Sequence, residues 1–379
     1  MGSVSNPPTP VTDPAPRTFA PMPRPVAWWE RIPAPVVTLA TLTLGLLTLC
    51  LLIPVPYAVR QPGPTVDTLG ESGDTPLISI PDAETFPTAG ELRLTTVSVA
   101  GGPGYPVGLT QVVQGWLDPR TTVVPRESVF PPDQTQEESA EQSQAQMTSS
   151  QENATAAALE ALGYDVTATL EIAGVIDGGA SASVAQEGDV ITGLTVDGEA
   201  HAIDSFTALS DLLEATPPGT DVTLVVDRDG TSTDLAITTG DDGEGGSVLG
   251  VLVDPTFDFP VEVDIEIANI GGPSAGTMFA LGIMEKLTEG DQTGGQVIAG
   301  TGTIDMTGDV GAIGGIVQKM YGSVRDGAHY FLAPESNCAD VVGNVPDGLQ
   351  VVSVATLEDA WTAVQAIGAG TAEDLPTCS

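Results

Sequence analysis

Few residues of this chain could perform chemistry, and one of them is a serine that follows a glycine-rich turn. Ser274 lies in GGPSAG, ahead of an apolar stretch, TMFALGIMEKL, with helical spacing. A serine before a helix is a common N-cap, so Ser274 could simply cap this one. As a nucleophile, it would need a base within hydrogen-bond reach. Both roles stay open on these residues alone.

The bases available to Ser274 are limited, because the chain contains only two histidines and two lysines. His329 falls in a short apolar strand and His201 in a polar loop, so neither is placed as a catalytic histidine. Lys319 falls in the first turns of a predicted helix, among the apolar residues of GAIGGIVQKMYG. Burial would lower the pKa of its ammonium group and let it accept a proton near neutral pH. The alternative is a surface lysine that buries only its aliphatic stem.

The same inventory argues against three other kinds of site. No HExxH motif, Cys/His cluster or paired CxxC occurs, so we expect no metal and no cofactor. Neither lysine follows a glycine, as the lysine of a Walker A motif does, so we expect no ATP site. The net charge is −40, with 51 acidic against 11 basic residues, which opposes binding to nucleic acid.

An apolar run near the N-terminus predicts one transmembrane helix. Residues 36–53 are uncharged and just long enough, at helical rise, to cross the hydrocarbon core. Three arginines precede the run, whereas 8 basic residues face 49 acidic ones after it. The positive-inside rule therefore places the Pro-rich and disordered tail, 1–35, in the cytoplasm and the bulk of the chain outside the cell membrane. A cleaved signal peptide is the alternative, although no small-x-small cleavage site follows the run.

The cysteines fit this topology. Cys50 lies in the apolar run, which leaves Cys338 and Cys378 in the exported part of the chain. Two exported cysteines predict a disulfide that ties the C-terminal tail to the last domain. Spacing alone does not show that the two are close, so free thiols remain the alternative.

Periodicity divides the exported part of the chain into two regions. Residues 90–99 read as a strand, 131–146 as a polar stretch, the alanine-rich segment after it as a helix ending near Gly163, and 221–238 as a hairpin with an Asp-Gly turn. Residues 239–247 read as a Gly-rich linker. Strands and helices then alternate, which indicates an α/β or α+β domain of catalytic size. The predicted strands there are 261–270, 295–305, 328–334 and 349–355, and the predicted helices are 275–288, 315–326 and 357–368.

The segments GGPSAGTMFALGIMEKL, VIAGTGTID and GGIVQK resemble the proteolytic domain of Lon proteases in order, spacing and local residues. The resemblance implies that Ser274 is the nucleophile, Lys319 the general base and Thr301 a support for the lysine. Gly271 and Gly272 would let the substrate approach closely. Lon proteins often carry an acidic residue at the position of Gly271, so the resemblance leaves the orientation of Lys319 undefined. It also implies ring-shaped homo-oligomers.

Residues 163–240 are similar to a PDZ domain, through the EGDVITGLTVDG turn, the predicted helix 205–215 and the closing hairpin. This similarity implies that an extended chain or a C-terminus docks beside strand 166–173, against that helix. Its carboxylate loop would be LGYD, formed by Leu162, Gly163, Tyr164 and Asp165.

Together these observations predict an α+β fold: a Lon-type proteolytic domain, 247–370, with an N-terminal part, 54–162, and a PDZ-like β-rich domain, 163–240, inserted into it or preceding it. The membrane-anchored arrangement resembles bacterial PDZ–Lon-like proteases that lack the Lon ATPase domain. We therefore expect an ATP-independent serine endopeptidase, with a Ser-Lys dyad, that cleaves membrane or extracytoplasmic proteins. The alternative is a non-catalytic, membrane-tethered PDZ receptor for peptides on a protease-like fold.

Overall fold

The computed structural model describes residues 33–52, 54–73, 75–131, 134–241, 243, 245–268 and 270–378. The chain divides into two units, 1–53 and 54–379. Within the first unit, α1 spans Ala34–Leu52, while most of the predicted cytoplasmic tail lies outside the described residues. Over the described ranges, no helix combines the length and apolar character that a membrane span requires. The predicted transmembrane helix is therefore not supported by this structure.

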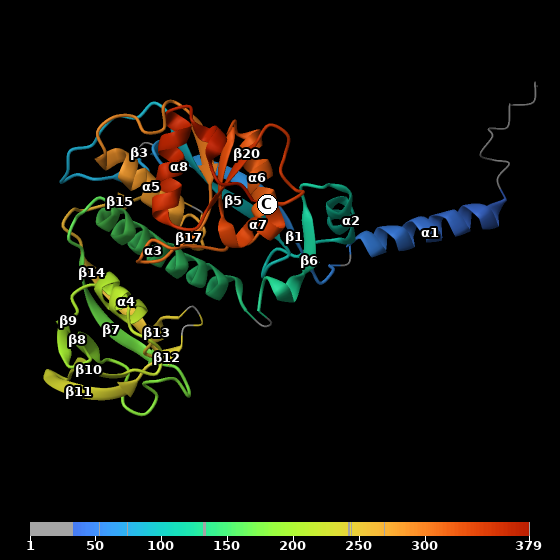
Figure 1. Cartoon of the computed structure of the whole chain (residues 1–379). Helices are drawn as coiled ribbons and strands as arrows, with labels where there is room; N and C mark the ends of the chain where they lie inside the picture. Colours follow the sequence, from blue (N-terminus) through green and yellow to red (C-terminus); the bar gives the residue numbers. More distant parts are fainter. Residues whose placement is uncertain are drawn as a thin grey trace, which may run out of the picture. The chain divides into compact units, whose positions relative to one another are not determined.

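A mixed six-stranded sheet forms the centre of the second unit, in the order β20-β19-β16-β5-β1-β6 (Figure 1). The four strands β5, β16, β19 and β20 run parallel, whereas β1 is antiparallel to both of its neighbours. The sheet is thus built from two distant segments of the chain. Its strands are β1 (Tyr57–Asp67), β5 (Glu91–Ala100), β6 (Thr122–Pro125), β16 (Val297–Gly300), β19 (Tyr330–Pro334) and β20 (Gln350–Val354).

Helices cover both faces of this sheet because alternate strand residues point to opposite sides. Leu92 and Ile298 pack into one core with α3 (Gln136–Ala161), α5 (Gly276–Leu287) and α8 (Leu357–Gly368). Ala299 and Phe331 pack into the other core with α6 (Ile316–Arg325) and α7 (Cys338–Val341). The result is a three-layer domain in which α5 and α6 lie on opposite faces.

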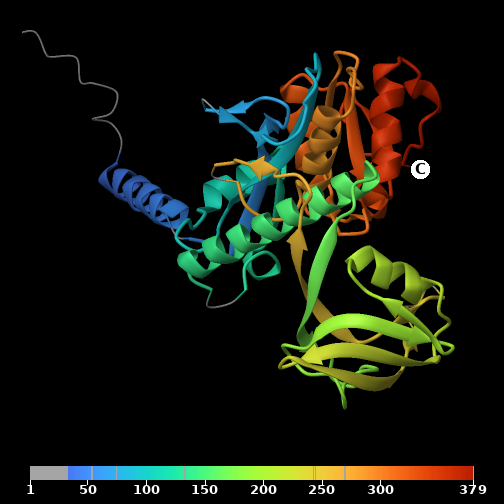
Figure 2. The same cartoon turned by 90° about the vertical axis from the view of Figure 1, so that its left-hand side faces the viewer.

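A second six-stranded sheet is inserted into this domain (Figure 2). Its order is β11-β10-β8-β7-β14, and β9 pairs with β8. The chain enters through β7 directly after α3 and leaves through its antiparallel neighbour β14, so entry and exit are adjacent. The PDZ-like region is therefore inserted into the catalytic domain rather than placed before it. It also extends beyond the predicted boundary at 240, because β14 belongs to its sheet. Its elements are β7 (Thr167–Val175), β8 (Val190–Val196), β9 (Glu199–Ala202), α4 (Phe206–Glu214), β10 (Asp221–Arg228), β11 (Thr231–Thr238) and β14 (Val251–Asp258).

Short elements complete the described part of the chain. They are β2 (Glu71–Ser72), β3 (Thr75–Pro76), β4 (Ile78–Ser79), α2 (Leu109–Leu117), η2 (Arg126–Ser128), β12 (Gly240–Asp241), β13 (Ser247–Val248), β15 (Asp264–Ile265), β17 (Thr303–Ile304), β18 (Val310–Gly311), η3 (Glu335–Asn337) and η4 (Ala372–Asp374).

The structure confirms the hairpin and the three predicted helices after the linker, and it corrects two other predictions. The segment 131–146 is not simply a polar stretch, because α3 begins at Gln136. Thr135 and Glu138 form a capping box there, which stabilises a polar start that hydrophobic periodicity does not reveal. The predicted strand 261–270 is reduced to β15, which among the described residues pairs only with β4. Its alternate apolar residues pack against the core instead of entering a sheet.

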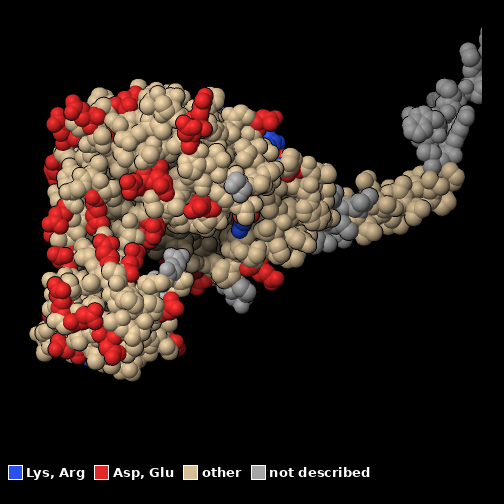
Figure 3. Space-filling view, in the orientation of Figure 1, with Lys and Arg blue, Asp and Glu red and all other residues tan. Residues whose placement is uncertain are grey.

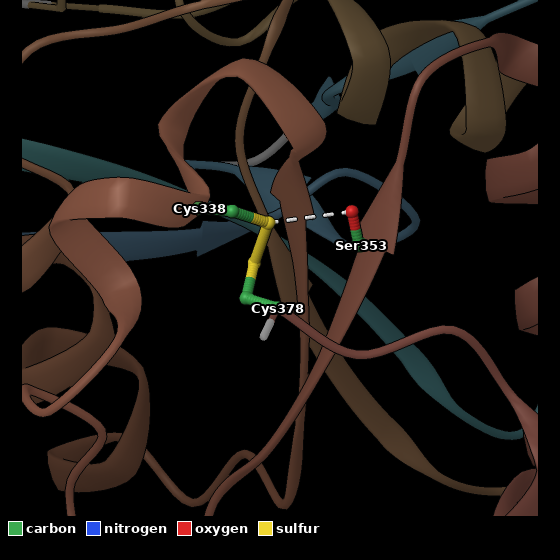
Figure 4. The surroundings of a disulfide bond; sticks show 3 residues. All are labelled: Cys338, Ser353 and Cys378. Atoms are coloured by element: carbon green, nitrogen blue, oxygen red, sulfur yellow. Dashed lines mark hydrogen bonds between the residues drawn. A yellow bond between two sulfur atoms is a disulfide. The ribbon is translucent and has the colours of Figure 1, made fainter.

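Cys338 and Cys378 are joined as a disulfide, as predicted. Cys338 bonds to Cys378, and the hydroxyl of Ser353 lies 3.4 Å from the Cys338 sulfur (Figure 4). The Ser353 backbone N–H donates to the carbonyl of Pro376 at 2.9 Å. The disulfide therefore holds the C-terminal tail along β20, one of the two edge strands of the central sheet.

Candidate active site

Ser274 lies in the turn that leads into α5, and its hydroxyl does not cap that helix. The N-cap residue is Ala275, with no side-chain capping bond, so the capping hypothesis for Ser274 is wrong. The turn itself needs glycine, because Gly272 has φ +87°, in the region that side chains disfavour. Its N–H donates to the carbonyl of Ser143 on α3 at 2.9 Å. The main chain before the serine is thus fixed against α3.

Lys319 reaches the same place from the opposite face of the sheet. It lies in the first turns of α6, which begins after Gly315, a residue in the left-handed conformation at φ +75°. The side chain is 2% exposed. Its Nζ lies 2.7 Å from Ser274 Oγ, 2.8 Å from Thr301 Oγ1 and 3.0 Å from the carbonyl oxygen of Thr95. The alternative of a lysine with an exposed ammonium group is therefore wrong.

Thr301 joins the lysine to the main chain of the serine. It directly follows β16, at the carboxyl edge of the central sheet, where the starts of α5 and α6 meet. Its Oγ1 donates to the carbonyl of Ser274 at 2.9 Å, and therefore accepts from Lys319. The N–H of Gly302 donates to the same Ser274 carbonyl at 3.1 Å. The position of the nucleophile is thereby fixed relative to its candidate base.

Burial sets the electrostatics of this cluster. Desolvation lowers the pKa of Lys319 to about 7, because the buried side chain disfavours the charged form. None of the three groups bonded to its Nζ is a carboxylate that would stabilise the ammonium ion. A neutral amine donates twice and accepts once. With Thr95 and Thr301 as acceptors, its lone pair faces the hydroxyl of Ser274, which is the geometry of proton removal from serine.

A groove of about 520 Å³ opens in front of the two residues. One wall is β5, which pairs with β16 only as far as Leu94, so the following residues leave a strand edge beside the groove. The opposite wall contains Gly271 and Gly272. Lys319 is the only ionisable side chain among its lining residues, which are Pro64, Leu94, Thr95, Thr96, Val97, Ser98, Val99, Met147, Ile270, Gly271, Gly272, Ser274, Ala275, Gly314 and Lys319. This shape and neutrality suit an extended peptide.

Comparison with known proteins now identifies the region that carries this site. Residues 264–365 match the profile of the Lon protease (S16) C-terminal proteolytic domain. The match supports a serine peptidase and includes Ser274, Thr301 and Lys319. The chain is also 42% identical to a Lon protease of Fusobacterium nucleatum over 79 residues, 21% of this chain and 10% of that protein. It is 34% identical to the archaeal Lon protease of Methanocaldococcus jannaschii over 92 residues, 24% of this chain and 14% of that protein.

These likenesses are local. The matched segment spans about a tenth of the length of the first curated relatives. Among solved structures, the chain is similar to the PDZ domain of an SdrC-like protein from Listeria innocua, with 20% identity and a TM-score of 0.20 over 22% of this chain and 92% of that one. The corresponding PDZ domain from Listeria monocytogenes gives 22% identity and a TM-score of 0.20, over 22% of this chain and 86% of that one.

The prediction that a peptide docks beside strand 166–173 is wrong. The segment 166–173 forms most of β7, which pairs with β14 on one side and β8 on the other, so it offers no free edge. The edge next to α4 belongs to β14 instead. An apolar groove of about 410 Å³ lies there, and the predicted carboxylate loop, 162–165, does not line it. Its lining residues are Ile176, Phe206, Leu209, Ser210, Leu213, Glu214, Ser247, Val248, Leu249, Gly250, Val251 and Val253.

Sequence reasoning missed three further contributors to these sites. Thr95 contributes only a backbone carbonyl to Lys319, which no side-chain pattern reveals. Ser150 Oγ donates to the carbonyl of Pro273 at 3.0 Å, from a helix whose sequence marks no role for it. The edge strand β14 did carry a signal, because Pro255 within it lacks an N–H and favours an edge position.

Proposed function

We propose that the protein is a serine endopeptidase in which Ser274 is the nucleophile and neutral Lys319 the general base. The observation that carries the proposal is the 2.7 Å contact between buried Lys319 Nζ and Ser274 Oγ, at the wall of a groove. The match to the Lon proteolytic domain supports the same reaction class. Thr301 would orient the lysine through its hydroxyl.

The proposed reaction starts with the transfer of the Ser274 hydroxyl proton to Lys319. Ser274 Oγ then forms a bond to the carbonyl carbon of a peptide, and an oxyanion develops on the carbonyl oxygen. When the C–N bond breaks, Lys319 returns the proton to the leaving amine, which leaves an ester on Ser274. Lys319 next takes a proton from water, whose oxygen attacks the ester. When the ester C–O bond breaks, Lys319 returns this proton to Ser274 Oγ, and a carboxylic acid product is released.

The test is hydrolysis of fluorescein-labelled casein by the full chain. Ser274→Ala and Lys319→Ala should each abolish cleavage, because one loses the nucleophile and the other the base. The matched control is Lys286→Ala, which removes the only other lysine of the chain. Labelling of Ser274 by a fluorophosphonate should require Lys319 as well. Cleavage that survives both dyad substitutions would refute the Ser-Lys mechanism, whereas a wild-type chain that neither cleaves casein nor is labelled would favour the non-catalytic receptor.

We also propose that the inserted sheet docks an extended peptide beside β14. Three features support this: β14 is an edge strand, Val251 and Val253 border the apolar groove, and α4 forms its other wall. A peptide that adds to such an edge gains main-chain hydrogen bonds, and the groove takes its apolar side chain. Gly250, at φ +73°, turns the chain at one end of the groove, where a C-terminal carboxylate would meet backbone groups. Docking here would select substrates for the dyad.

Two further parts of the proposal concern the setting of the reaction. We propose that cleavage needs no ATP, because neither lysine of this sequence belongs to a Walker A motif. We also propose that residues 36–53 anchor the chain in the cell membrane, with both domains outside, because the run is uncharged and arginines precede it. Casein hydrolysis with and without ATP tests the first, and sedimentation with membranes after alkaline extraction tests the second. Stimulation by ATP or release by alkali would contradict them.

A further inference from the structure

Ser150 is a buried hydroxyl group directly behind the turn that carries the nucleophile. It lies on α3, is 3% exposed, and donates through Oγ to the carbonyl of Pro273 at 3.0 Å. Pro273 immediately precedes Ser274 in the chain. The carbonyl that Ser150 holds therefore belongs to the same peptide group as the N–H of Ser274. None of the proton transfers proposed above uses Ser150.

The bond to Ser150 fixes the direction of the Ser274 N–H. A trans peptide group is planar, and its C=O and N–H point in opposite directions. Because the Pro273 carbonyl points toward Ser150, the Ser274 N–H points away from it. Ser274 borders the groove, and within the described part of the chain its N–H has no hydrogen-bond partner. It is thus a donor free to bind a substrate oxygen.

The neighbouring amide is held differently. The N–H of Gly272 donates to the carbonyl of Ser143, which is also on α3, so it is already occupied. The same helix therefore occupies one N–H of the turn and orients the peptide group of another. Other α3 hydroxyls have local roles: buried Thr155 donates to the carbonyl of Gln151, one turn earlier in its own helix. Thr155 is therefore a control for the loss of a buried α3 hydroxyl group that does not bond to the turn.

We propose that Ser150 is a positioning residue of the peptidase. It orients the Pro273–Ser274 peptide group so that the Ser274 N–H donates to the oxyanion that forms when Ser274 Oγ attacks a peptide carbonyl. The inference rests on the proposed function. A donor aimed at the oxyanion accelerates the reaction because it stabilises charge that the ground state lacks, so its loss lowers kcat rather than raising KM.

The test compares Ser150→Ala with the control Thr155→Val, which removes a buried α3 hydroxyl that does not contact the turn. With labelled casein, Ser150→Ala should lower kcat about tenfold to 100-fold at unchanged KM, since loss of an oxyanion donor costs about 100-fold or more. Affinity for a peptide aldehyde should fall by a similar factor, because its adduct on Ser274 carries the same oxyanion. The pH midpoint of activity should stay near 7, since Lys319 is untouched.

Thermal unfolding of each variant corrects kcat for the folded fraction. Ser150→Cys, which retains a weaker donor, should show an intermediate loss. The inference is overturned if Ser150→Ala matches Thr155→Val in kcat and aldehyde affinity, or if its kcat falls only through a shifted pH midpoint. Ser274→Ala separates the two levels of the proposal. If it retains activity, the proposed peptidase itself fails, whatever Ser150→Ala shows.

Discussion

Thr301 Oγ1 is shared between Lys319, from which it accepts at 2.8 Å, and the Ser274 carbonyl, to which it donates at 2.9 Å. This single hydroxyl couples the side chain of the candidate base to the main chain of the nucleophile. It is fully buried, so no water can replace it without a rearrangement of the site. The activity should therefore depend on the hydroxyl group of Thr301 rather than on the size of its side chain.

Replacing Thr301 tests that distinction. Thr301→Val keeps the shape but leaves Lys319 and the Ser274 carbonyl each short of a partner, at a cost of about 1–3 kcal/mol in unfolding free energy. We expect kcat on labelled casein to fall by about 10-fold or more, because the lysine is no longer held on Ser274. Thr301→Ser keeps the hydroxyl and should retain most of the activity. The role would be wrong if Ser and Val variants had the same kcat.

The depressed pKa of Lys319 predicts the pH profile of the reaction. The base works only when neutral, so kcat/KM should rise as pH increases through about 7 and level off above it. Lys319→Arg keeps a permanent positive charge and should be inactive at every pH, whereas Lys286→Arg should keep the wild-type profile. The profile is measured from about pH 5 to 9 with labelled casein. A flat profile over this range would argue against a neutral lysine as base.

Glu285 predicts a second pH effect, on stability rather than on activity. It is fully buried in α5, accepts the N–H of Gln292 at 3.0 Å, and its other carboxyl oxygen has no partner among the described residues. Burial raises its pKa from 4.5 to about 7. The folded state therefore binds this proton more tightly than the unfolded state does. Its contribution is fully present below pH 4.5 and is lost as pH rises through about 7.

Removing that carboxyl group gives the corresponding measurement. A shift of this size corresponds to about 3 kcal/mol, so Glu285→Gln should unfold at a higher temperature than the wild type at pH 8 and close to it at pH 5. The exposed Glu289→Gln, in the loop after α5, is the control. Thermal unfolding at both pH values checks the prediction. An equal change in Tm at pH 5 and pH 8 would contradict it.

Sequence reasoning succeeded where short local patterns determine the structure. GPSAG and GGIVQK placed Ser274 and Lys319 at the starts of two helices, and the resemblance supplied their partnership. It failed where long-range packing decides. The open edge of the inserted sheet depends on β14, which pairs with β7 from the far side of the inserted region. Backbone contributors such as the Thr95 carbonyl were also invisible, because every residue has one.

The acidic surface of the molecule indicates which charge a docked peptide should carry. On the face of the molecule that Figure 3 shows, acidic side chains are widely spread and basic ones are very few, as expected from the net charge of −40. Long-range repulsion would therefore disfavour acidic peptides, and the apolar groove between α4 and β14 would supply short-range contacts. A basic peptide that ends in an apolar residue with a free carboxylate is the expected ligand class.

Filling the groove should abolish that binding. Ser210→Trp places a large ring among the apolar lining residues, whereas Asp211→Trp adds the same ring at an exposed position of α4 and is the control. We expect fluorescence anisotropy with a labelled basic peptide ending in valine to show at least about tenfold weaker binding for Ser210→Trp only, because the ring occupies the space of the ligand side chain. Equal affinities for the two variants would place the ligand elsewhere.

The disulfide gives a prediction about the edge of the catalytic domain. Cys338 and Cys378 are 40 residues apart in sequence, and their bond holds the tail along β20. Breaking such a link lowers the unfolding free energy by about 2–4 kcal/mol, mainly because the unfolded chain gains freedom. Cys338→Ser with Cys378→Ser should therefore lower the urea midpoint while leaving kcat on labelled casein unchanged at low temperature, since neither residue contacts the dyad. Reducing agent should have the same effect on the wild type and none on the double variant. A wild-type urea midpoint unaffected by reduction would show that the bond contributes nothing to stability.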